Sequence, residues 1–360
     1  MYNFDENFFY KNKRYKDILD SFMSNFSAIE KILDLKFLPM MQKITPFIRD
    51  PFIHIGNNTI LIPHPAFERI SFNDLPNYID KNLEYKQTIV SEYQYSSKFL
   101  NNFILSLYDK KIKLSYTYFE GGNIFITYNK NGEKKVLSGN SNLDYTLFGL
   151  EMFNYFKSKY NELLKIENNL PHEQKYSNTE IAKIILIKKL FAEDFGVDPK
   201  DIIFINQVEY HLDLFLFPDS KENIFLVDYK MSLELINYLI NHISHFELTE
   251  TDLKYLKKCK ANIIEKLASP KYSQLENIKK ELEKNGFTVI NIPGNFPGIL
   301  VDNLDINFMN GLCIDKDGKS YFVIGGADGR IGNILMKTIS FILAPYFEKV
   351  YFVGRKPNET

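Results

Sequence analysis

The sequence predicts an α/β fold built from repeated strand–strand–helix–strand units. Hairpin patterns recur along the chain, and each is followed by a helical pattern and a further strand. Hydrophobic residues make up 45% of the 360 residues, which is enough to bury a sizeable core. No linker or low-complexity stretch divides the chain, so we expect one domain over residues 1–360. Within it, residues 1–44 form a helical lead-in and residues 45–355 form the repeat region.

The first half of the chain contains the first of these units. Residues 47–62 show a strand, a Gly-Asn-Asn turn and a second strand, which is typical of a hairpin. A later turn at Asn131-Gly132 leads through a strand into helical spacing. The predicted elements are a helical segment over 15–40, strands within 47–62, a helix over 86–109, strands over 114–119, 124–128 and 135–137, and helices over 145–168 and 179–195.

The second half repeats the pattern around a long helical region, which breaks near Ser269-Pro270. The pair Asn285-Gly286 is typical of a helix C-cap and ends that region. The predicted elements are strands over 202–206, 209–217 and 223–229, a helical region over 232–285, strands over 287–292, 306–314 and 320–324, a helix over 330–347 and a strand over 350–354.

The composition argues against several classes of protein. The formal net charge of −1 gives no basic surface for nucleic acid. No apolar run approaches membrane-spanning length, and residues 1–14 lack the apolar core of a signal peptide. With only two cysteines, Cys259 and Cys313, we expect no disulfide framework and a reducing compartment. The sequence therefore predicts a cytoplasmic protein, with a secreted effector of unrecognised signal as the alternative.

An aromatic, apolar run over 209–217 carries two ionisable side chains, His211 and Asp213. In a strand, residues two apart point to the same face, so these side chains would lie side by side. An imidazole beside a carboxylate on a rigid element suits proton transfer. Because a lone histidine is more often structural or solvated, the pair alone leaves both interpretations open.

Two further polar motifs end predicted strands, Arg49-Asp50-Pro51-Phe52 and Glu120-Gly121-Gly122-Asn123. Paired glycines after a carboxylate indicate close approach of the backbone or a positive φ. Taken in order with His211-Leu212-Asp213, these motifs resemble the pentein superfamily of guanidino-group-modifying proteins. The resemblance covers residues 45–355. The motifs most resemble those of arginine deiminases, and the later half of the chain most resembles agmatine deiminases.

The resemblance implies an α/β propeller of these repeats around a central pit, and an amidine C–N hydrolase or amidinotransferase. It implies that Asp50 and Asp213 hold a guanidinium, whose planar fork of N–H donors suits paired carboxylates. Glu120 would support the site, and Asn123 stands where the family often has aspartate. His211 would act as general acid and base. A cysteine thiolate would attack the central carbon and form a covalent thiouronium intermediate.

The resemblance implies no cofactor, and a ligand that is a small guanidinium compound or an arginine side chain. Arginine, agmatine, methylated arginine and protein arginine all stay open. In the family the cysteine follows a last helix and strand, which here are 330–347 and 350–354, and no cysteine follows them. Either the segment with the nucleophilic cysteine is missing, or Cys313 is the nucleophile. A small thiol in an apolar strand is, however, ordinarily structural. Cys259, in a lysine-rich helix, is expected to be half-exposed and is the weaker candidate.

Two other functions stay open. One is a catalytically silent pentein-fold protein that binds a guanidinium ligand or a partner protein. The other is an oxidoreductase, because the glycine-rich turn over 325–332 resembles an NAD(P)-binding motif, with Arg355 placed to meet a 2′-phosphate. The glycine spacing departs from G-x-G-x-x-G, and only one such unit is present. The six histidines are scattered, so no metal site is predicted.

Overall fold

The computed structural model describes residues 53–56, 59–62, 111–152, 161, 165, 179–299 and 305–353. Contacts divide the chain into two compact units. Of the described residues, unit 1 contains those up to Ile126 together with Lys134–Gln207, and unit 2 contains Thr127–Glu133 and those from Val208 onward. Asp50 and the helices expected over 15–40 and 86–109 lie outside the described residues.

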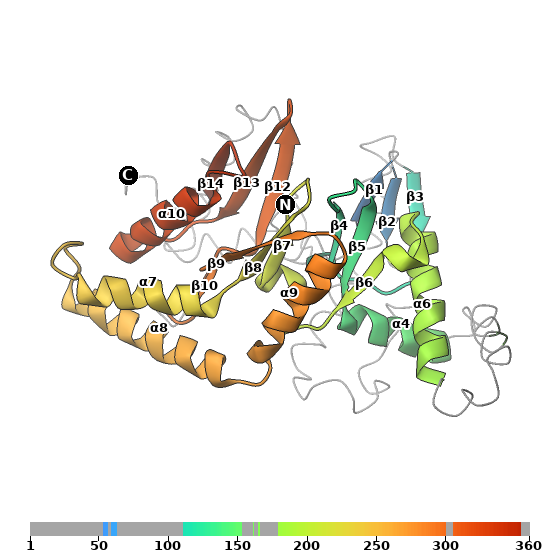
Figure 1. The fold of residues 1–360 in the computed structure, drawn as a ribbon, viewed down its shortest axis with the longest axis horizontal. Helices are drawn as coiled ribbons and strands as arrows, with labels where there is room; N and C mark the ends of the chain where they lie inside the picture. The colour runs from blue at the N-terminus through green and yellow to red at the C-terminus, as the bar shows by residue number, and fades with distance from the viewer. Residues whose placement is uncertain are drawn as a thin grey trace, which may run out of the picture. The chain divides into compact units, whose positions relative to one another are not determined.

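The described residues form four three-stranded sheets, and in each of them the strands lie side by side in the order in which they occur in the chain (Figure 1). The second and third strands are parallel in all four, and the first two are antiparallel in the sheets that begin with β1, β7 and β12. The strands of these sheets are β1 (Ile53–Gly56), β2 (Thr59–Ile62), β3 (Lys111–Leu114), β4 (Ile124–Tyr128), β5 (Lys134–Gly139), β6 (Ile202–Ile205), β7 (Leu216–Pro218), β8 (Asn223–Val227), β9 (Thr288–Ile292), β12 (Gly311–Lys316), β13 (Lys319–Gly325) and β14 (Lys349–Val353). A two-stranded sheet pairs β10 (Asn295–Phe296) with β11 (Ile306–Asn307).

Helices connect the second strand of a sheet to its parallel third strand, as parallel neighbours require. The connecting helices are α4 (Asn140–Met152) and α6 (Thr179–Phe195) before β6, α7 (Tyr229–Asn241), α8 (Glu250–Ala268) and α9 (Leu275–Lys284) before β9, and α10 (Gly329–Leu343) before β14. The predicted strand–strand–helix–strand repeat is thus confirmed in the last three sheets. None of the described helices is long and apolar enough to cross a membrane.

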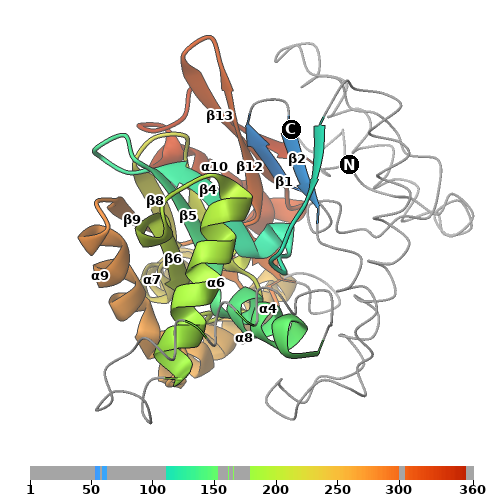
Figure 2. The same ribbon diagram turned by 90° about the vertical axis from the view of Figure 1, so that its right-hand side faces the viewer.

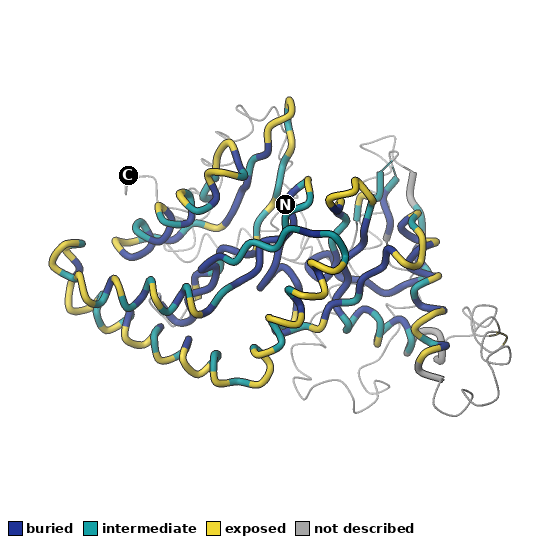
Figure 3. Tube along the Cα trace, in the orientation of Figure 1, coloured by how far each residue is buried: buried dark blue, intermediate teal, exposed yellow. Residues whose placement is uncertain are grey.

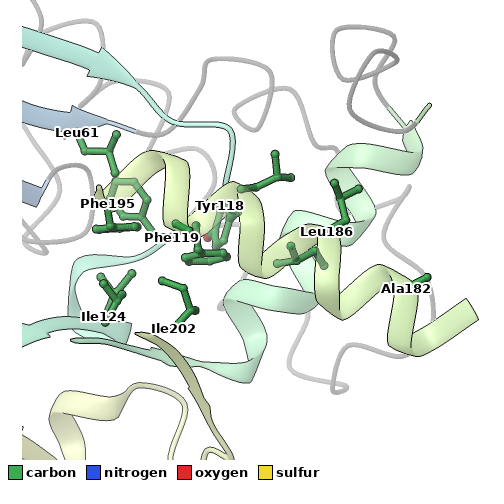
Figure 4. Close-up of a cluster of buried hydrophobic side chains, with 13 residues drawn as sticks. Leu61, Tyr118, Phe119, Ile124, Ala182, Leu186, Phe195 and Ile202 are labelled. Atoms are coloured by element: carbon green, nitrogen blue, oxygen red, sulfur yellow. The ribbon is translucent and has the colours of Figure 1, made fainter. Parts of the chain in front are cut away.

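One core joins α6 to the strands of unit 1 (Figures 2 and 4). Phe191 and Phe195 of α6 stack with ring centroids 6.0 Å apart, and Phe195 meets Phe119 edge-on at 6.1 Å. Side chains of β2, β4, β5 and β6 join the same core. Burying a large apolar side chain stabilises the fold by about 1.5–3 kcal/mol. Because Phe119 is fully buried, this core fixes the chain immediately before Glu120.

Stacked phenylalanines hold two sheets of unit 2 together. Phe217 of β7 stacks on Phe225 of β8 with centroids 4.6 Å apart, and on Phe322 of β13 at 4.4 Å. Phe347, beyond the end of α10, packs on both Phe225 and Phe322. The dark trace of β7 and β8 in Figure 3 shows how deeply these strands are buried. The core therefore holds β7, the strand that follows His211.

Side-chain caps begin two helices of unit 2. Asp228 Oδ1 accepts hydrogen bonds from two backbone N–H groups at the start of α7. Thr249 and Asp252 form a capping box at the start of α8. Such caps each stabilise by about 0.5–2 kcal/mol. The prediction of one helical region over 232–285 with a single break is wrong, because the chain also breaks between α7 and α8.

Three predicted strands are wrong. The strand predicted over 114–119 is an irregular segment, because β3 ends at Leu114. The run over 209–217 is a turn followed by the short strand β7. The strand predicted over 306–314 is two strands, β11 and β12, with a bend between them. Each segment contains buried apolar residues at its bend, and a short apolar run does not by itself distinguish a strand from a turn.

Candidate functional site

Two short 3-10 turns carry predicted site residues at the same place in successive repeats. The turn η3 (Gly121–Asn123) follows Glu120 and leads into β4, and η7 (Leu212–Leu214) follows His211 and leads into β7. Glu120 and His211 are both extended, with φ of −116° and −126°. Their carbonyl groups accept hydrogen bonds from the N–H three residues later, at 2.8 Å and 3.4 Å. The repeat therefore gives a carboxylate and an imidazole equivalent positions.

Glu120 is buried in unit 1 beside two tyrosines. The residue is 7% exposed, and the Tyr118 hydroxyl donates to its Oε1 at 2.6 Å. The rings of Tyr118 and Tyr145 lie 4.7 Å apart. Burial is the largest cause of the raised pKa of Tyr145, and the negative charges of Glu120 and Asp144 raise this pKa further. A carboxylate in this environment suits a cationic partner with N–H donors.

A buried aspartate near the end of α6 anchors the segment that leads to Glu120. Asp194 Oδ2 accepts hydrogen bonds from Tyr116 N at 2.8 Å, Thr117 N at 3.0 Å and Thr117 Oγ1 at 2.9 Å. Burial raises the pKa of Asp194 to about 7, against the opposing effects of the Thr117 hydrogen bonds and the charge of Lys113. Three hydrogen bonds to one oxygen thus fix the chain three residues before Glu120.

His211 and Asp213 lie on one buried turn of unit 2. They are 7% and 5% exposed. The strand predicted here is wrong, because His211 is extended and Leu212–Leu214 form a 3-10 turn directly after it. The ring of Tyr210 lies 4.6 Å from that of His211. A buried turn with an imidazole and a carboxylate can still hold a cation and transfer a proton.

A network around Glu209 anchors this turn from its N-terminal side. Lys266 Nζ lies 2.6 Å from Glu209 Oε1, and the hydroxyls of Tyr272 and Tyr229 donate to the same oxygen. Burial lowers the pKa of Lys266, but hydrogen bonds with Glu209 and Tyr272 and the charge of Glu209 outweigh it, so that this pKa is raised. The charged lysine therefore holds Glu209, two residues before His211.

The contacts of Asn123 serve the fold of unit 1. Its Nδ2 donates to Ser141 Oγ at 2.7 Å, and its carbonyl oxygen accepts from Asn142 Nδ2 at 3.1 Å. A Cβ on Gly139 would lie 2.1 Å from Asn123 Oδ1, so glycine makes room for the amide. We therefore interpret Asn123 as a residue that positions the start of α4.

The two cysteines occupy different environments. Cys313 is half-buried on β12, and its Sγ donates to the Pro218 carbonyl at 3.2 Å. Pro218 ends β7, so this contact lies at the end of β7 opposite to the His211 turn. Cys259 is fully buried, contrary to the predicted half-exposure, and burial and the charge of Asp305 raise its pKa to about 12. A thiol with such a pKa is a poor nucleophile near neutral pH.

The glycine-rich turn that resembles a nucleotide-binding motif joins β13 to α10. A Cβ on Gly332 would lie 2.7 Å from the Ala327 carbonyl oxygen, so close packing explains this glycine. Gly329 has φ of +82°, which favours glycine at the start of α10. Arg355 lies outside the described residues. Within the described part of the chain, no three metal-ligating side chains gather into a group.

Comparisons with known proteins give structural neighbours, whereas neither protein-family models nor curated proteins match the sequence. The structure aligns with C. jejuni agmatine deiminase over 92% of this chain and 72% of that chain, at 17% identity and a TM-score of 0.43. It aligns with a citrulline complex of a dimethylarginine dimethylaminohydrolase mutant from Pseudomonas aeruginosa over 94% and 82%, at 11% identity and a TM-score of 0.38. Both neighbours are members of the pentein superfamily, which the sequence motifs resemble.

Three residues that hold the two turns were not predicted as site residues. Tyr118 and Glu209 each lie two residues before a predicted site residue, so the local sequence contains a signal for them. Asp194 has no such signal, because its partners lie 77 and 78 residues away in the chain. The fold alone identifies it.

Proposed function

We propose that this chain is a guanidino-group-modifying protein of the pentein type, whose repeats close into an α/β propeller around a substrate pit. The observation that carries the proposal is the pair of equivalent turns, which bury the carboxylate of Glu120 and the imidazole of His211 at one position of successive repeats. The order of the motifs at Asp50, Glu120 and His211-Leu212-Asp213 supports it.

In this proposal, Asp50, Glu120 and Asp213 bind the guanidinium group of arginine, agmatine or a protein arginine. A guanidinium stays charged and presents N–H donors in a planar fork. Charge-assisted hydrogen bonds from that fork to carboxylates are about twice as strong as neutral ones. Glu120 and Asp213 are both buried, and a buried carboxylate gains most from a bound cation.

The proposed reaction replaces one guanidinium nitrogen by oxygen. A thiolate adds to the central carbon, the C–N bond breaks, and ammonia leaves with a proton from His211. His211 then takes a proton from water as the water adds to the thiouronium carbon. The C–S bond breaks, which returns the thiolate, and the hydroxyl proton on the central carbon passes through solvent to the released ammonia, which leaves a neutral ureido product and ammonium. In the amidinotransferase variant, an amine replaces the water. Cys313 is the candidate thiol.

A second candidate is guanidinium binding without turnover, and the positions of the two cysteines favour it. Cys259 is buried with a raised pKa. Cys313 contacts Pro218, at the end of β7 away from His211. Binding needs the carboxylates and no thiol, so the two candidates differ in one requirement, a reactive cysteine beside His211.

Product release and binding together test both candidates. Ammonia and ureido product are measured with L-arginine, agmatine and an arginine-containing peptide, and calorimetry measures the binding of each. A deiminase predicts release that falls at least about 100-fold in His211→Ala and in Cys313→Ala. His245→Ala, which changes an exposed histidine, should leave release intact. Binding without release, lost in Asp213→Asn, supports the second candidate. Absence of both product release and binding with all three ligands would contradict both candidates.

A further inference from the structure

The repeat that contains β12, β13 and β14 has an asparagine at the position of Glu120 and His211. Glu120 precedes β4 by four residues, and His211 precedes β7 by five. Asn307, a half-buried residue at the end of β11, precedes β12 by four. The amide of Asn307 therefore occupies the same place in its repeat as the carboxylate and the imidazole occupy in theirs.

The side chain of Asn307 supports the bend before β12. In the turns η3 and η7, a backbone carbonyl accepts a hydrogen bond from the N–H three residues later. Before β12, Asn307 Oδ1 instead accepts from Met309 N at 2.8 Å, and asparagine commonly closes turns through such a bond two residues along the chain. The oxygen of the amide therefore serves its own bend, and its NH2 group is available to another element.

The NH2 group of Asn307 reaches the His211 turn. Asn307 Nδ2 donates to the carbonyl of Leu214, the last residue of η7, at 3.1 Å. The bond that closes η7, from Leu214 N to the His211 carbonyl, is long at 3.4 Å, whereas the equivalent bond in η3 is 2.8 Å. N–H···O bonds are ordinarily about 2.7–3.2 Å long, and longer ones are weaker. The η7 turn therefore gains more from a bond to a neighbouring element than η3 does.

We propose that Asn307 is a positioning residue, which holds Asp213 in the orientation that binds a guanidinium group. The ion pair of Glu209 with Lys266 anchors the His211 turn before its start, and Asn307 anchors the last residue of the turn. Asp213 lies between these two anchored points. A binding side chain keeps its geometry only when the residues that carry it are fixed. The inference rests on the proposed function, because it requires that Asp213 binds a guanidinium.

Calorimetric titration of the full chain with agmatine tests this role. Serine at position 307 keeps an oxygen for the bend before β12 but is too short to donate to the Leu214 carbonyl, so Asn307→Ser should weaken agmatine binding about tenfold. Asn310→Ser changes an exposed asparagine of the same segment and should leave the affinity unchanged. In the Asp213→Asn background, Asn307→Ser should cause no further loss, because Asn307 acts through Asp213.

Three results would overturn the role of Asn307 and leave the proposed function intact. They are wild-type affinity in Asn307→Ser, an equal loss in Asn310→Ser, and a loss from Asn307→Ser that persists in the Asp213→Asn background. Absence of agmatine binding in the wild-type protein would overturn both proposals.

A second variant keeps the test decisive if circular dichroism shows that Asn307→Ser does not fold. In Asn307→Asp at about pH 8, the ionised carboxylate still accepts from Met309 N but cannot donate to the Leu214 carbonyl. The same loss of about tenfold is expected, although the added negative charge by itself would favour a cation. Unchanged or tighter binding of agmatine in this variant would contradict the role of Asn307.

Discussion

The turns before β4 and β7 share their backbone geometry, but carboxylates in different environments anchor them. Asp194, on the approach to Glu120, accepts three hydrogen bonds from uncharged groups, and Lys113 Nζ lies 3.8 Å from its other oxygen. Glu209, on the approach to His211, has a lysine Nζ at 2.6 Å together with two tyrosine hydroxyls. The first anchor depends on uncharged donors, and the second depends on a close ion pair.

This difference decides how each anchor responds to pH and to substitution. Desolvation disfavours a buried carboxylate that has no close cation, and it accounts for the raised pKa of Asp194. A close ammonium offsets that penalty in the Glu209 network, where the pKa of Lys266 is raised. The unit 1 anchor should therefore be sensitive to pH near neutrality, and the unit 2 anchor should be sensitive to loss of the lysine charge.

The largest expected effect is that of Asp194→Ala. Three buried donors lose their acceptor, and an unsatisfied buried group costs about 1–3 kcal/mol, so the free energy of unfolding should fall by about 3 kcal/mol or more. Urea denaturation measures it. The control is Asp198→Ala, whose side chain is 71% exposed in an ion pair with Lys200 and which should change stability by less than about 0.5 kcal/mol. Equal losses in the two variants would contradict the anchor.

The pH dependence of stability should differ between the wild-type protein and Asp194→Asn. Because the folded pKa of about 7 lies above the unfolded value of about 3.9, the folded state binds this proton more tightly. The contribution of Asp194 is complete below about pH 4 and is lost as the pH rises towards about 7, with a slope of up to about 1.4 kcal/mol per pH unit. Asp194→Asn should remove that slope. Urea titrations between about pH 4.5 and about pH 8 measure it, and parallel curves would contradict the assignment.

A smaller loss is expected from Lys266→Met, which removes the charge beside Glu209 and keeps most of the aliphatic stem. Two tyrosine hydroxyls still donate to Glu209, so unfolding free energy should fall by about 1–2 kcal/mol. Lys319→Met is the control, since it breaks an exposed pair with Glu348, and exposed pairs contribute little to stability. If both variants lose equally little in urea denaturation, the network does not anchor the His211 turn.

Elements with a strong periodic pattern could be predicted from the sequence. The helix predicted over 179–195 is α6 (Thr179–Phe195), and the strand predicted over 124–128 is β4 (Ile124–Tyr128). The break before α8 could also have been found, because Thr249 and Asp252 have the spacing of a capping box. The repeat of strands and helices followed from these patterns.

The turns that carry the candidate site could not be predicted as turns. In the His211 turn the charged residue Asp213 is buried together with the apolar residues Leu212 and Phe215. No alternation of polar and apolar residues therefore marks where β7 begins. The anchor at Asp194 depends on a contact between distant parts of the chain. The motifs indicated which residues to examine, and only the structure shows the turns on which they lie and what holds those turns.

The proposed function requires that the Glu120 and His211–Asp213 turns serve one guanidinium, and a double-mutant cycle on ligand binding tests this proposal most directly. Dissociation constants for agmatine and L-arginine are measured in the wild-type protein, Glu120→Gln, Asp213→Asn and the double variant. The claim predicts that each single change weakens binding at least about tenfold, and that the two losses are not additive because they act on one bound group. Wild-type affinity in either single variant, or two independent losses that add, would contradict it.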